Sequence, residues 1–388
     1  MLKNRINRTF IEILKSIKYG SLNLTDYDGI VHTFKGSNDG PNAELTLHSN
    51  KVISNMVFRG DIAFADDYRN GLWDSQDLSA LIEFGLLNHN ELNQFIFGSK
   101  IQQIISNFSY FFKKNTKSGS KKNIHAHYDL GNDFYQLWLD STMTYSSALF
   151  LKDKENLSDA QNNKYDRIID RIGNGNKEIL EIGCGWGGFA ERIKNKTQHR
   201  LDGITISTEQ LHFANNRLKN SSRTALNFCD YRDIRKKYDA IVSIEMFEAV
   251  GEEYWSSYFS QIKKSLKPKG KAVIQTITID DFYFENYRKT GDAIRSFIFP
   301  GGMLPSPEVF KIEIEKVGLK ITDQHFFGFD YAKTLNHWLE NFNLKSNEIK
   351  TLNFDEPFMR LWRYYLCSCI GAFKAQRTNV MQVELQHA

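Results

Sequence analysis

The chain has 388 residues, of which 41% are hydrophobic, 25% charged and 13% aromatic; this composition fits a globular protein and excludes a disordered or collagen-like chain. The net charge of +4 is too small to indicate a nucleic-acid partner, and we expect none. No apolar run approaches the roughly 20 residues of a membrane span, and basic residues interrupt any amino-terminal secretory signal. The cysteines lack CxxC spacing, so we expect neither a disulfide framework nor a zinc ribbon, and we predict a cytoplasmic protein.

The first 19 residues predict a basic amphipathic helix, followed by Gly20 as a C-terminal cap. Such a helix either docks on its own domain or lies on an anionic membrane surface, and both interpretations stay open here. Its apolar positions, at spacings of three and four, are Leu2, Ile6, Phe10, Ile13, Leu14 and Ile17.

Three further segments complete the first part of the chain. Residues 21–75 predict short strands and turns, with a strong turn signal over 37–41, and residues 76–112 predict helices. Residues 113–123 are lysine-rich and polar, which is typical of a linker. We therefore expect a small mixed α+β domain over residues 1–112.

A different pattern follows, in which apolar segments rich in Ile and Val alternate with amphipathic helical stretches. This alternation predicts a mostly parallel sheet covered on both faces by helices, in an α/β domain over residues 124–388. The tail, 345–388, is predicted to be helical. The predicted strands are 178–182, 201–206, 239–245 and 271–279.

A glycine-rich turn follows the first of these strands. Gly183, Gly185 and Gly188 satisfy GxGxxG, a weak pattern that also permits a dinucleotide site or no ligand. Glu181 favours S-adenosylmethionine, because its carboxylate would repel a pyrophosphate but can meet an ammonium group. The next strand also lacks the terminal acid that holds a nicotinamide ribose, since Asp202 comes too early.

Several blocks of the sequence occur in a fixed order around the glycine loop. They are HYDLGNDFY at 127–135, MTYSSA at 143–148, the glycine loop itself, GITIS at 203–207, MFEAVG at 246–251, IFPGG at 298–302 and YAKTL at 331–335. With these blocks the sequence resembles the cyclopropane-fatty-acyl-phospholipid synthase family and the related mycolic acid cyclopropane synthases, over about residues 123–385. The resemblance implies a Rossmann-like class I methyltransferase fold with a seven-stranded sheet.

The activity that the resemblance implies is transfer of a one-carbon unit from S-adenosylmethionine to the cis double bond of an unsaturated phospholipid acyl chain, giving a cyclopropane fatty acid. An isolated alkene is a weak nucleophile, so this chemistry needs alignment in a dry apolar pocket. The residues that the resemblance and the glycine-loop pattern together assign to the methyl donor are Tyr145, Ser146, Glu181, Gly183, Gly185, Thr205, Gln210, Asp230 and Tyr231.

The family also holds a bicarbonate ion as general base, and here the match is incomplete. Ser147 stands where bacterial members have cysteine, and Gln275 stands where they have histidine. A glutamine can donate a hydrogen bond but cannot carry a proton, which leaves the bicarbonate an open possibility. The catalytic set that the resemblance implies is Glu248, Tyr331, Gln275, Ile277 and Ser147.

These departures keep three alternatives open. Deprotonation at another carbon, or hydride delivery by a partner, would give a 10-methylene or 10-methyl branched fatty acid. A protein that kept the fold but lost catalysis would be a lipid-binding protein. A small-molecule N- or O-methyltransferase is disfavoured, because the matches extend beyond the methyl-donor site.

Outside this site we expect no metal, since His125 and His127 form only a weak HxH signal, and we expect Cys184 to be a packed residue. The substrate implies docking on a phospholipid membrane surface, and the family's amino-terminal domain implies membrane docking and a homodimer. We therefore expect peripheral association with the inner membrane. The candidate headgroup contacts are the first helix, the lysines of 113–122, and Lys263, Lys264, Lys267, Lys269 and Lys271.

Overall fold

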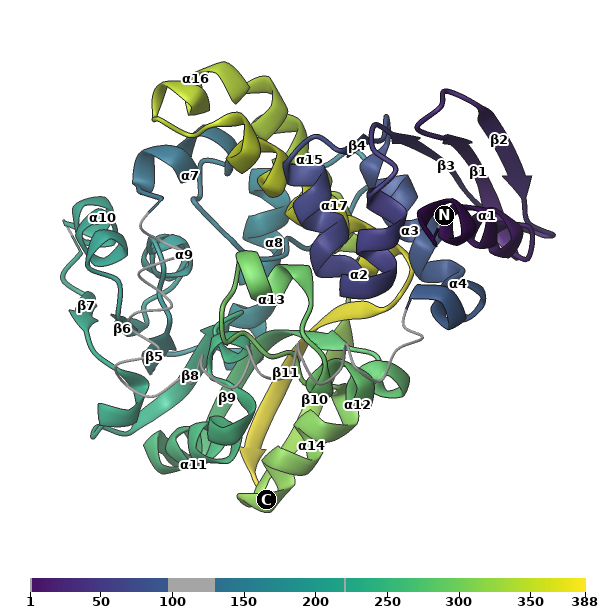
Figure 1. Ribbon diagram of the computed structural model, residues 1–388. Helices are drawn as coiled ribbons and strands as arrows, with labels where there is room; N and C mark the ends of the chain where they lie inside the picture. The colour runs from purple at the N-terminus through teal and green to yellow at the C-terminus, as the bar shows by residue number, and fades with distance from the viewer. Residues whose placement is uncertain (1, 97–129, 220) are drawn as a thin grey trace. The chain divides into compact units, whose positions relative to one another are not determined.

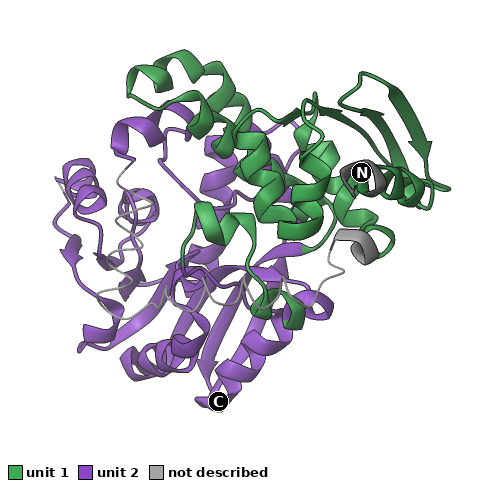
Figure 2. Ribbon diagram, in the orientation of Figure 1, with its two compact units in different colours: residues 1–112, 285–300, 338–377 green, residues 113–284, 301–337, 378–388 purple. Residues whose placement is uncertain are grey.

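The computed structural model describes residues 2–96, 130–219 and 221–388, which form two compact units (Figure 2). The first unit contains the described part of 1–112 together with 285–300 and 338–377. The second contains the described part of 113–284 together with 301–337 and 378–388. The predicted linker, 113–123, lies outside the described residues.

The second unit thus differs from the continuous stretch 124–388 expected from the sequence, because helix α17 (Glu356–Lys374) packs in the first unit. It contacts α2 (Val52–Arg69) and α3 (Leu78–Leu87) there. Its buried Tyr364 and Cys367 belong to the same apolar cluster as α1 (Leu2–Leu14). The helix amphipathicity is therefore satisfied by a core that lies far away in sequence.

In the first unit, a four-stranded sheet has the order β2-β1-β3-β4. Phe10 and Leu14 of α1 and the adjoining Ile17 are buried in its core, which confirms the interpretation that this helix docks on its own domain. The strands are β1 (Tyr19–Thr25), β2 (Val31–Lys35), β3 (Asn38–Leu47) and β4 (Trp73–Asp74), and the other helices are α4 (His89–Ile96), α13 (Ala293–Phe297) and α16 (Ser346–Thr351).

Two predictions for residues 21–75 are wrong. Helix α2 occupies much of a region expected to hold only strands and turns, and the turn signal over 37–41 falls on the start of β3. Gly60, inside α2, has φ 64° and ψ −155°, so the helix is kinked there. A helical period interrupted by a kink is hard to recognise from periodicity alone.

The second unit is built on a seven-stranded sheet of order β10-β11-β9-β8-β5-β6-β7, which confirms the prediction of a mostly parallel α/β fold (Figure 1). Strands β5 to β9 run parallel, whereas β11 is antiparallel to both β9 and β10. The strands are β5 (Glu178–Ile182), β6 (Arg200–Thr205), β7 (Thr224–Phe228), β8 (Tyr238–Ile244), β9 (Leu266–Ile279), β10 (Leu319–Phe326) and β11 (Thr378–His387).

Helices cover both faces of this sheet (Figure 1). On one face, α8 and α9 bury Ile168 and Phe189 against Ile179 and Val242. On the other face, α11 packs against β9 and α14. The helices are α7 (Asn132–Trp138), α8 (Leu157–Ile172), α9 (Gly188–Lys196), α10 (Thr208–Leu218), α11 (Trp255–Ser265), α12 (Asp281–Lys289), α14 (Pro307–Lys316) and α15 (Gly328–Leu344). Each of α12 and α15 begins in the second unit and ends in the first.

The prediction of a helical tail is correct for α17 but wrong for 378–387, which forms β11. The helix ends at Lys374, and Gln376 adopts a left-handed conformation with φ 54° that turns the chain. Strand β11 then pairs on both sides and is buried on both faces, although its residues 381–386 alternate between apolar and polar with the period of two that is typical of a strand. Across the described residues, we find no helix with the length and apolarity that a membrane crossing requires.

Candidate active site

The predicted site residues gather at one edge of the large sheet. Strands β5, β6, β7 and β8 are parallel neighbours, so their carboxyl ends meet at the same edge (Figure 1). Each is followed at once by a segment that the sequence singled out. In an open α/β sheet this edge is where ligands bind.

The glycine loop after β5 has the backbone that its composition predicts. Gly183 and Gly185 have φ values of 83° and 51°, in the left-handed region that side chains rarely adopt. The loop is anchored because the amides of Gly183 and Cys184 donate to the carbonyl of Ile204, at 2.9 and 3.0 Å. A Cβ built on Gly185 would meet no atom within 4 Å, so this part of the loop faces open space that a ligand can approach.

Glu181 supplies a buried carboxylate just before this loop. It is 3% exposed, and its Oε2 has no hydrogen-bond partner in the part of the chain that the structure describes. Burial raises the pKa of Glu181 to about 8, against the opposing effect of Lys164. An orphaned buried oxygen next to a glycine loop fits the ammonium group of the predicted methyl donor. Cys184 is buried, as expected.

The remaining residues assigned to the methyl donor follow the next two strands. Thr205 ends β6, and its hydroxyl donates to the Gln210 amide oxygen at 3.2 Å. Asp230 follows β7, where it caps a short 3-10 turn and accepts two bonds from Arg232, at 2.8 and 2.6 Å. Tyr231 packs edge-on against Tyr258.

Tyr145 and Ser146 come from the segment between α7 and α8. Tyr145 packs against Tyr135, which also packs against Trp186 of the glycine loop, with ring centroids 5.5 and 5.0 Å apart. The Ser146 hydroxyl accepts from the Lys164 ammonium at 2.7 Å. Aromatic packing therefore places this segment against the glycine loop.

The five residues predicted to be catalytic fall into two groups. Ser147, Gln275 and Tyr331 converge on the side chain of Glu245, a residue that the sequence analysis did not single out. The Ser147 amide and the Gln275 side-chain amide donate to Oε1 of Glu245 at 2.9 and 2.7 Å. The Tyr331 hydroxyl donates to Oε2 at 2.5 Å.

Glu248 and Ile277 form the second group. The Ile277 amide donates to Oε1 of Glu248 at 2.5 Å, and the Thr276 hydroxyl donates to the same atom at 3.0 Å. Oε2 of Glu248 is buried with no hydrogen-bond partner among the described residues. Burial, and then repulsion from Glu245, raise the pKa of Glu248 to about 8, so this carboxyl group holds a proton at neutral pH.

The buried ammonium group of Lys164 interacts both with Ser146, assigned to the methyl donor, and with Glu245. Lys164 on α8 is 0% exposed, and besides Ser146 it donates to the Gln161 amide oxygen at 2.7 Å. Burial lowers the pKa of Lys164, and the carboxylate of Glu245 is the main opposing influence. Lys164 therefore offsets negative charge on Glu245.

Sequence reasoning missed both Glu245 and Lys164. A signal existed for Glu245, because it directly follows the apolar strand β8. Glu181 likewise lies near the carboxyl end of an apolar strand. The left-handed φ of 49° at Glu245 could not be foreseen, since the residue type does not favour it. Lys164 carries no distinguishing signal, because a lysine on an amphipathic helix normally reaches solvent.

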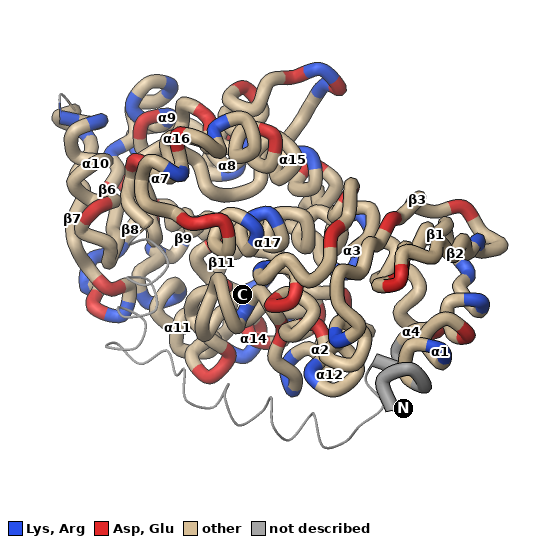
Figure 3. The backbone as a smooth tube through the Cα atoms, turned by 45° about the horizontal axis from the view of Figure 1, so that its top comes forward, with Lys and Arg blue, Asp and Glu red and all other residues tan. Residues whose placement is uncertain are grey.

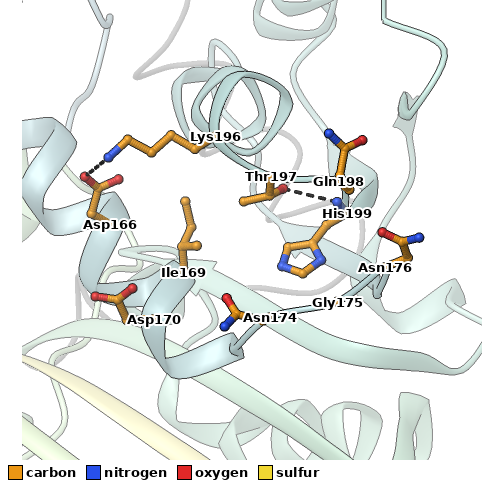
Figure 4. A pocket seen from close by; sticks show the side chains of 10 residues that line it. All are labelled: Asp166, Ile169, Asp170, Asn174, Gly175, Asn176, Lys196, Thr197, Gln198 and His199. Carbon is orange, nitrogen blue, oxygen red and sulfur yellow. Dashed lines mark hydrogen bonds and ion pairs between the residues drawn. The ribbon is translucent and has the colours of Figure 1, made fainter.

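A polar hollow of about 560 Å³ lies at the opposite edge of the sheet (Figure 4). It is formed where the chain enters β5 and β6, and its walls include Asp166, Asn174 and His199. Asp166 there is paired with Lys196 at 2.8 Å (Figure 4). Charged and amide side chains do not suit an acyl chain, so this hollow is separate from the candidate site.

Within the described ranges, no three His, Cys, Asp or Glu side chains gather in a way that could hold a metal ion. His125 and His127 lie outside those ranges.

Comparison with known proteins identifies the family of the chain. A family model described as mycolic acid cyclopropane synthetase matches residues 115–383. The chain is 33% identical to cyclopropane-fatty-acyl-phospholipid synthase of Escherichia coli K12 (88% of this chain, 87% of that protein). It is also 33% identical to tuberculostearic acid methyltransferase UfaA1 of Mycobacterium tuberculosis (90% and 84%). The crystal structure of mycolic acid cyclopropane synthase CmaA1 complexed with SAH and CTAB has a TM-score of 0.64 and 29% identity (69% and 98%). The chain therefore belongs to the mycolic acid cyclopropane synthetase family.

Proposed function

We propose that this protein transfers the methyl carbon of S-adenosylmethionine to the cis double bond of an unsaturated phospholipid acyl chain and closes a cyclopropane ring. The family match over residues 115–383 is the observation that carries the proposal. The acidic side chains gathered at the carboxyl edge of the sheet support it, because the reaction develops positive charge on the lipid and an ionised carboxylate at this edge can stabilise that charge.

The reaction needs two bond-forming steps. The π electron pair of the alkene bonds to the methyl carbon, and the carbon–sulfur bond breaks with its electron pair on sulfur. A base then removes one proton from the new methyl group, and the electron pair of that C–H bond closes the ring. The lipid gains one carbon and two hydrogens in total.

Different residues of this chain would bind the methyl donor and surround the reacting centre. The segments after β5, β6 and β7 would hold the methyl donor, which is consumed as a substrate, through the residues named for it above. Glu181 is placed to accept from its ammonium group. Glu248 bonds to the Ile277 amide and fixes the end of β9 beside the reacting centre. Tyr331, Gln275 and Ser147 surround Glu245.

The test is an incubation of the purified chain with S-adenosylmethionine and dioleoylphosphatidylglycerol vesicles. We expect release of S-adenosylhomocysteine together with a lipid one CH₂ heavier that resists catalytic hydrogenation of alkenes. Cofactor binding without release would instead indicate the non-catalytic lipid-binding protein. Release with vesicles absent and a small amine present would indicate a small-molecule methyltransferase.

A methyl-branched product is a second candidate. The observation that favours it is the 33% identity over 90% of this chain to a protein named as a tuberculostearic acid methyltransferase. A 10-methylene lipid has the same mass as the cyclopropane lipid but takes up hydrogen on catalytic hydrogenation. A 10-methyl lipid is two hydrogens heavier and would require a reductant. Mass analysis before and after hydrogenation separates all three products.

Peripheral docking on the inner membrane is proposed from the substrate, whose acyl chain lies in a bilayer. Basic and acidic residues are interspersed along both units in the view of Figure 3. Lys267 and Lys271 also have acidic partners, Asp239 at 3.0 Å and Glu384 at 3.1 Å. Co-sedimentation with anionic and zwitterionic vesicles tests docking, and sedimentation equilibrium tests the proposed homodimer.

A further inference from the structure

We propose that the carboxylate of Glu245 is the general base of this enzyme, so that ring closure needs no bicarbonate. This inference rests on the proposed function and names the group that accepts the proton in its second step. It replaces the expectation, drawn from the family resemblance, that Ser147, Gln275 and Tyr331 help to hold a separate anion.

The first argument is the hydrogen bonding of Glu245. Three donors, from Ser147, Gln275 and Tyr331, already surround a carboxylate that is part of the chain. They use three of the roughly four lone pairs that a carboxylate offers, which leaves one to receive a proton. A separate anion that used the same donors would have to displace this side chain.

The second argument is that the arrangement around Glu245 is held rigidly. Gln275 is fully buried, and its amide oxygen accepts from Gln382 on β11 at 2.9 Å, so its amide nitrogen is directed at Glu245. The Glu245 amide in turn donates to the Gln275 carbonyl at 2.8 Å. This bonding keeps Glu245 at φ 49°, a conformation that costs a non-glycine residue roughly 1–2 kcal/mol. Strain of this kind clusters at functional sites.

The third argument is charge. Glu245 and Glu248 lie close enough to repel each other, and both residues are half-buried. Burial raises the pKa of Glu245 as it does that of Glu248, but at Glu245 three hydrogen-bond donors and the nearby Lys164 ammonium oppose the rise. A base must be ionised before it acts, and Glu245 is the member of the pair whose ionised form has more hydrogen-bond donors and a nearby ammonium group to stabilise it.

The proposed step is balanced. The Glu245 carboxylate takes a proton from the methyl group newly bonded to the lipid. The electrons of that C–H bond form the last bond of the three-membered ring, and the positive charge on the lipid disappears. The protonated Glu245 returns its proton to solvent after product release, so no co-reactant is consumed.

The experiment uses the full chain, dioleoylphosphatidylglycerol vesicles and CO₂-free buffer under argon, with and without added sodium bicarbonate. Wild-type protein is expected to form cyclopropane lipid at the same rate in both buffers. A wild-type rate that depends on bicarbonate would overturn the inference while leaving the proposed function intact. Absence of any lipid product in both buffers would remove the proposed function itself.

Variants separate a base from a structural residue. Glu245→Gln is expected to lower cyclopropane formation by roughly 10²–10⁴-fold. It should also raise the ratio of S-adenosylhomocysteine released to cyclopropane formed, because methyl transfer precedes deprotonation. A structural residue would lower both quantities together and leave the ratio unchanged, and that outcome would overturn the inference. Glu253→Gln makes the same charge change at an exposed position and is the matched control.

Two further variants keep the inference testable if Glu245→Gln does not fold. Glu245→Asp retains a carboxylate on a shorter side chain, and we expect reduced turnover that is still independent of bicarbonate. Glu245→Gly suits the left-handed backbone and vacates the space among the three donors. Added bicarbonate is expected to restore part of its ring formation, whereas full activity of Glu245→Gly in CO₂-free buffer would overturn the inference.

Discussion

The two edges of the large sheet treat acidic residues in opposite ways. At the amino edge, Glu178 begins β5 and is paired with Lys236 and Lys267, each at 3.2 Å, and these hydrogen bonds hold its pKa below the ordinary value. At the carboxyl edge, Glu181 is the last residue but one of the same strand, and burial raises its pKa to about 8. The two glutamates lie three residues apart in one strand.

The opposite pKa shifts of Glu178 and Glu181 reflect different environments at the two edges. Exposed carboxylates with lysine partners contribute little to the stability of a protein. Buried carboxylates that outnumber the nearby ammonium group are costly, and a fold retains them where charge must later be met by a ligand or a reaction. We therefore propose that the carboxyl edge holds the reaction, and four predictions test this contrast.

The largest effect is expected for Lys164→Met. Removing the ammonium takes away the positive charge that favours the ionised form of Glu245, and it leaves the Ser146 hydroxyl without its donor. We expect a loss of about 3–5 kcal/mol in the free energy of unfolding, measured by denaturant titration. Activity that remains should move to higher pH, because the pKa of Glu245 would rise further. Lys196→Met, at the amino edge, is the control and should lose less than about 1 kcal/mol.

A smaller effect is expected for Gly183→Ala in the glycine loop. Its φ of 83° is strained for alanine, and the new Cβ would lie 3.0 Å from Cγ of Met246. We expect a loss of roughly 1–3 kcal/mol in stability and weaker binding of S-adenosylmethionine by calorimetry. Gly175→Ala, at the amino edge, has φ 104° but no atom within 4 Å of its Cβ. It should lose stability without changing that affinity, and equal losses of affinity in both variants would contradict this account.

The third prediction concerns pH. The pKa of Glu248 is raised to about 8 in the folded chain, whereas the ordinary pKa of a glutamate is 4.5. The contribution of protonated Glu248 to the free energy of unfolding is therefore fully present below pH 4.5 and is lost as the pH rises through about 8. Glu248→Gln should gain stability relative to wild type across this window, by roughly 1–3 kcal/mol at its upper end. Glu178→Gln should show the opposite sign, since the Glu178 pKa is lowered and its contribution is lost as the pH falls.

The smallest effect is expected for Lys236→Gln at the amino edge. Lys236 pairs with Glu178 and with Asp202 at 3.0 Å, but its side chain is 49% exposed. Solvent screening limits the loss to about 0.5 kcal/mol, and added salt should abolish it. A loss as large as that of Lys164→Met would erase the proposed distinction between the edges.

The sequence predicted the framework of the second unit well, because β5, β6, β8 and β9 are short apolar segments separated by helical periods. It also identified most of the residues at the carboxyl edge. It failed for β11, whose pairing on both sides depends on strands that are distant in sequence. It failed for Glu245 for a related reason, since that residue is defined by donors from three other segments of the chain.

The position of β11 has a consequence for biosynthesis. Gln382 reaches Gln275 across 107 residues of sequence, and β11 fills the space between β9 and β10. A nascent chain that has emerged only as far as α17 leaves one edge of β9 unpaired, and such an edge can recruit other chains. Folding of this unit must therefore wait for a late segment of translation, so premature termination before residue 378 should yield aggregates rather than a weak enzyme.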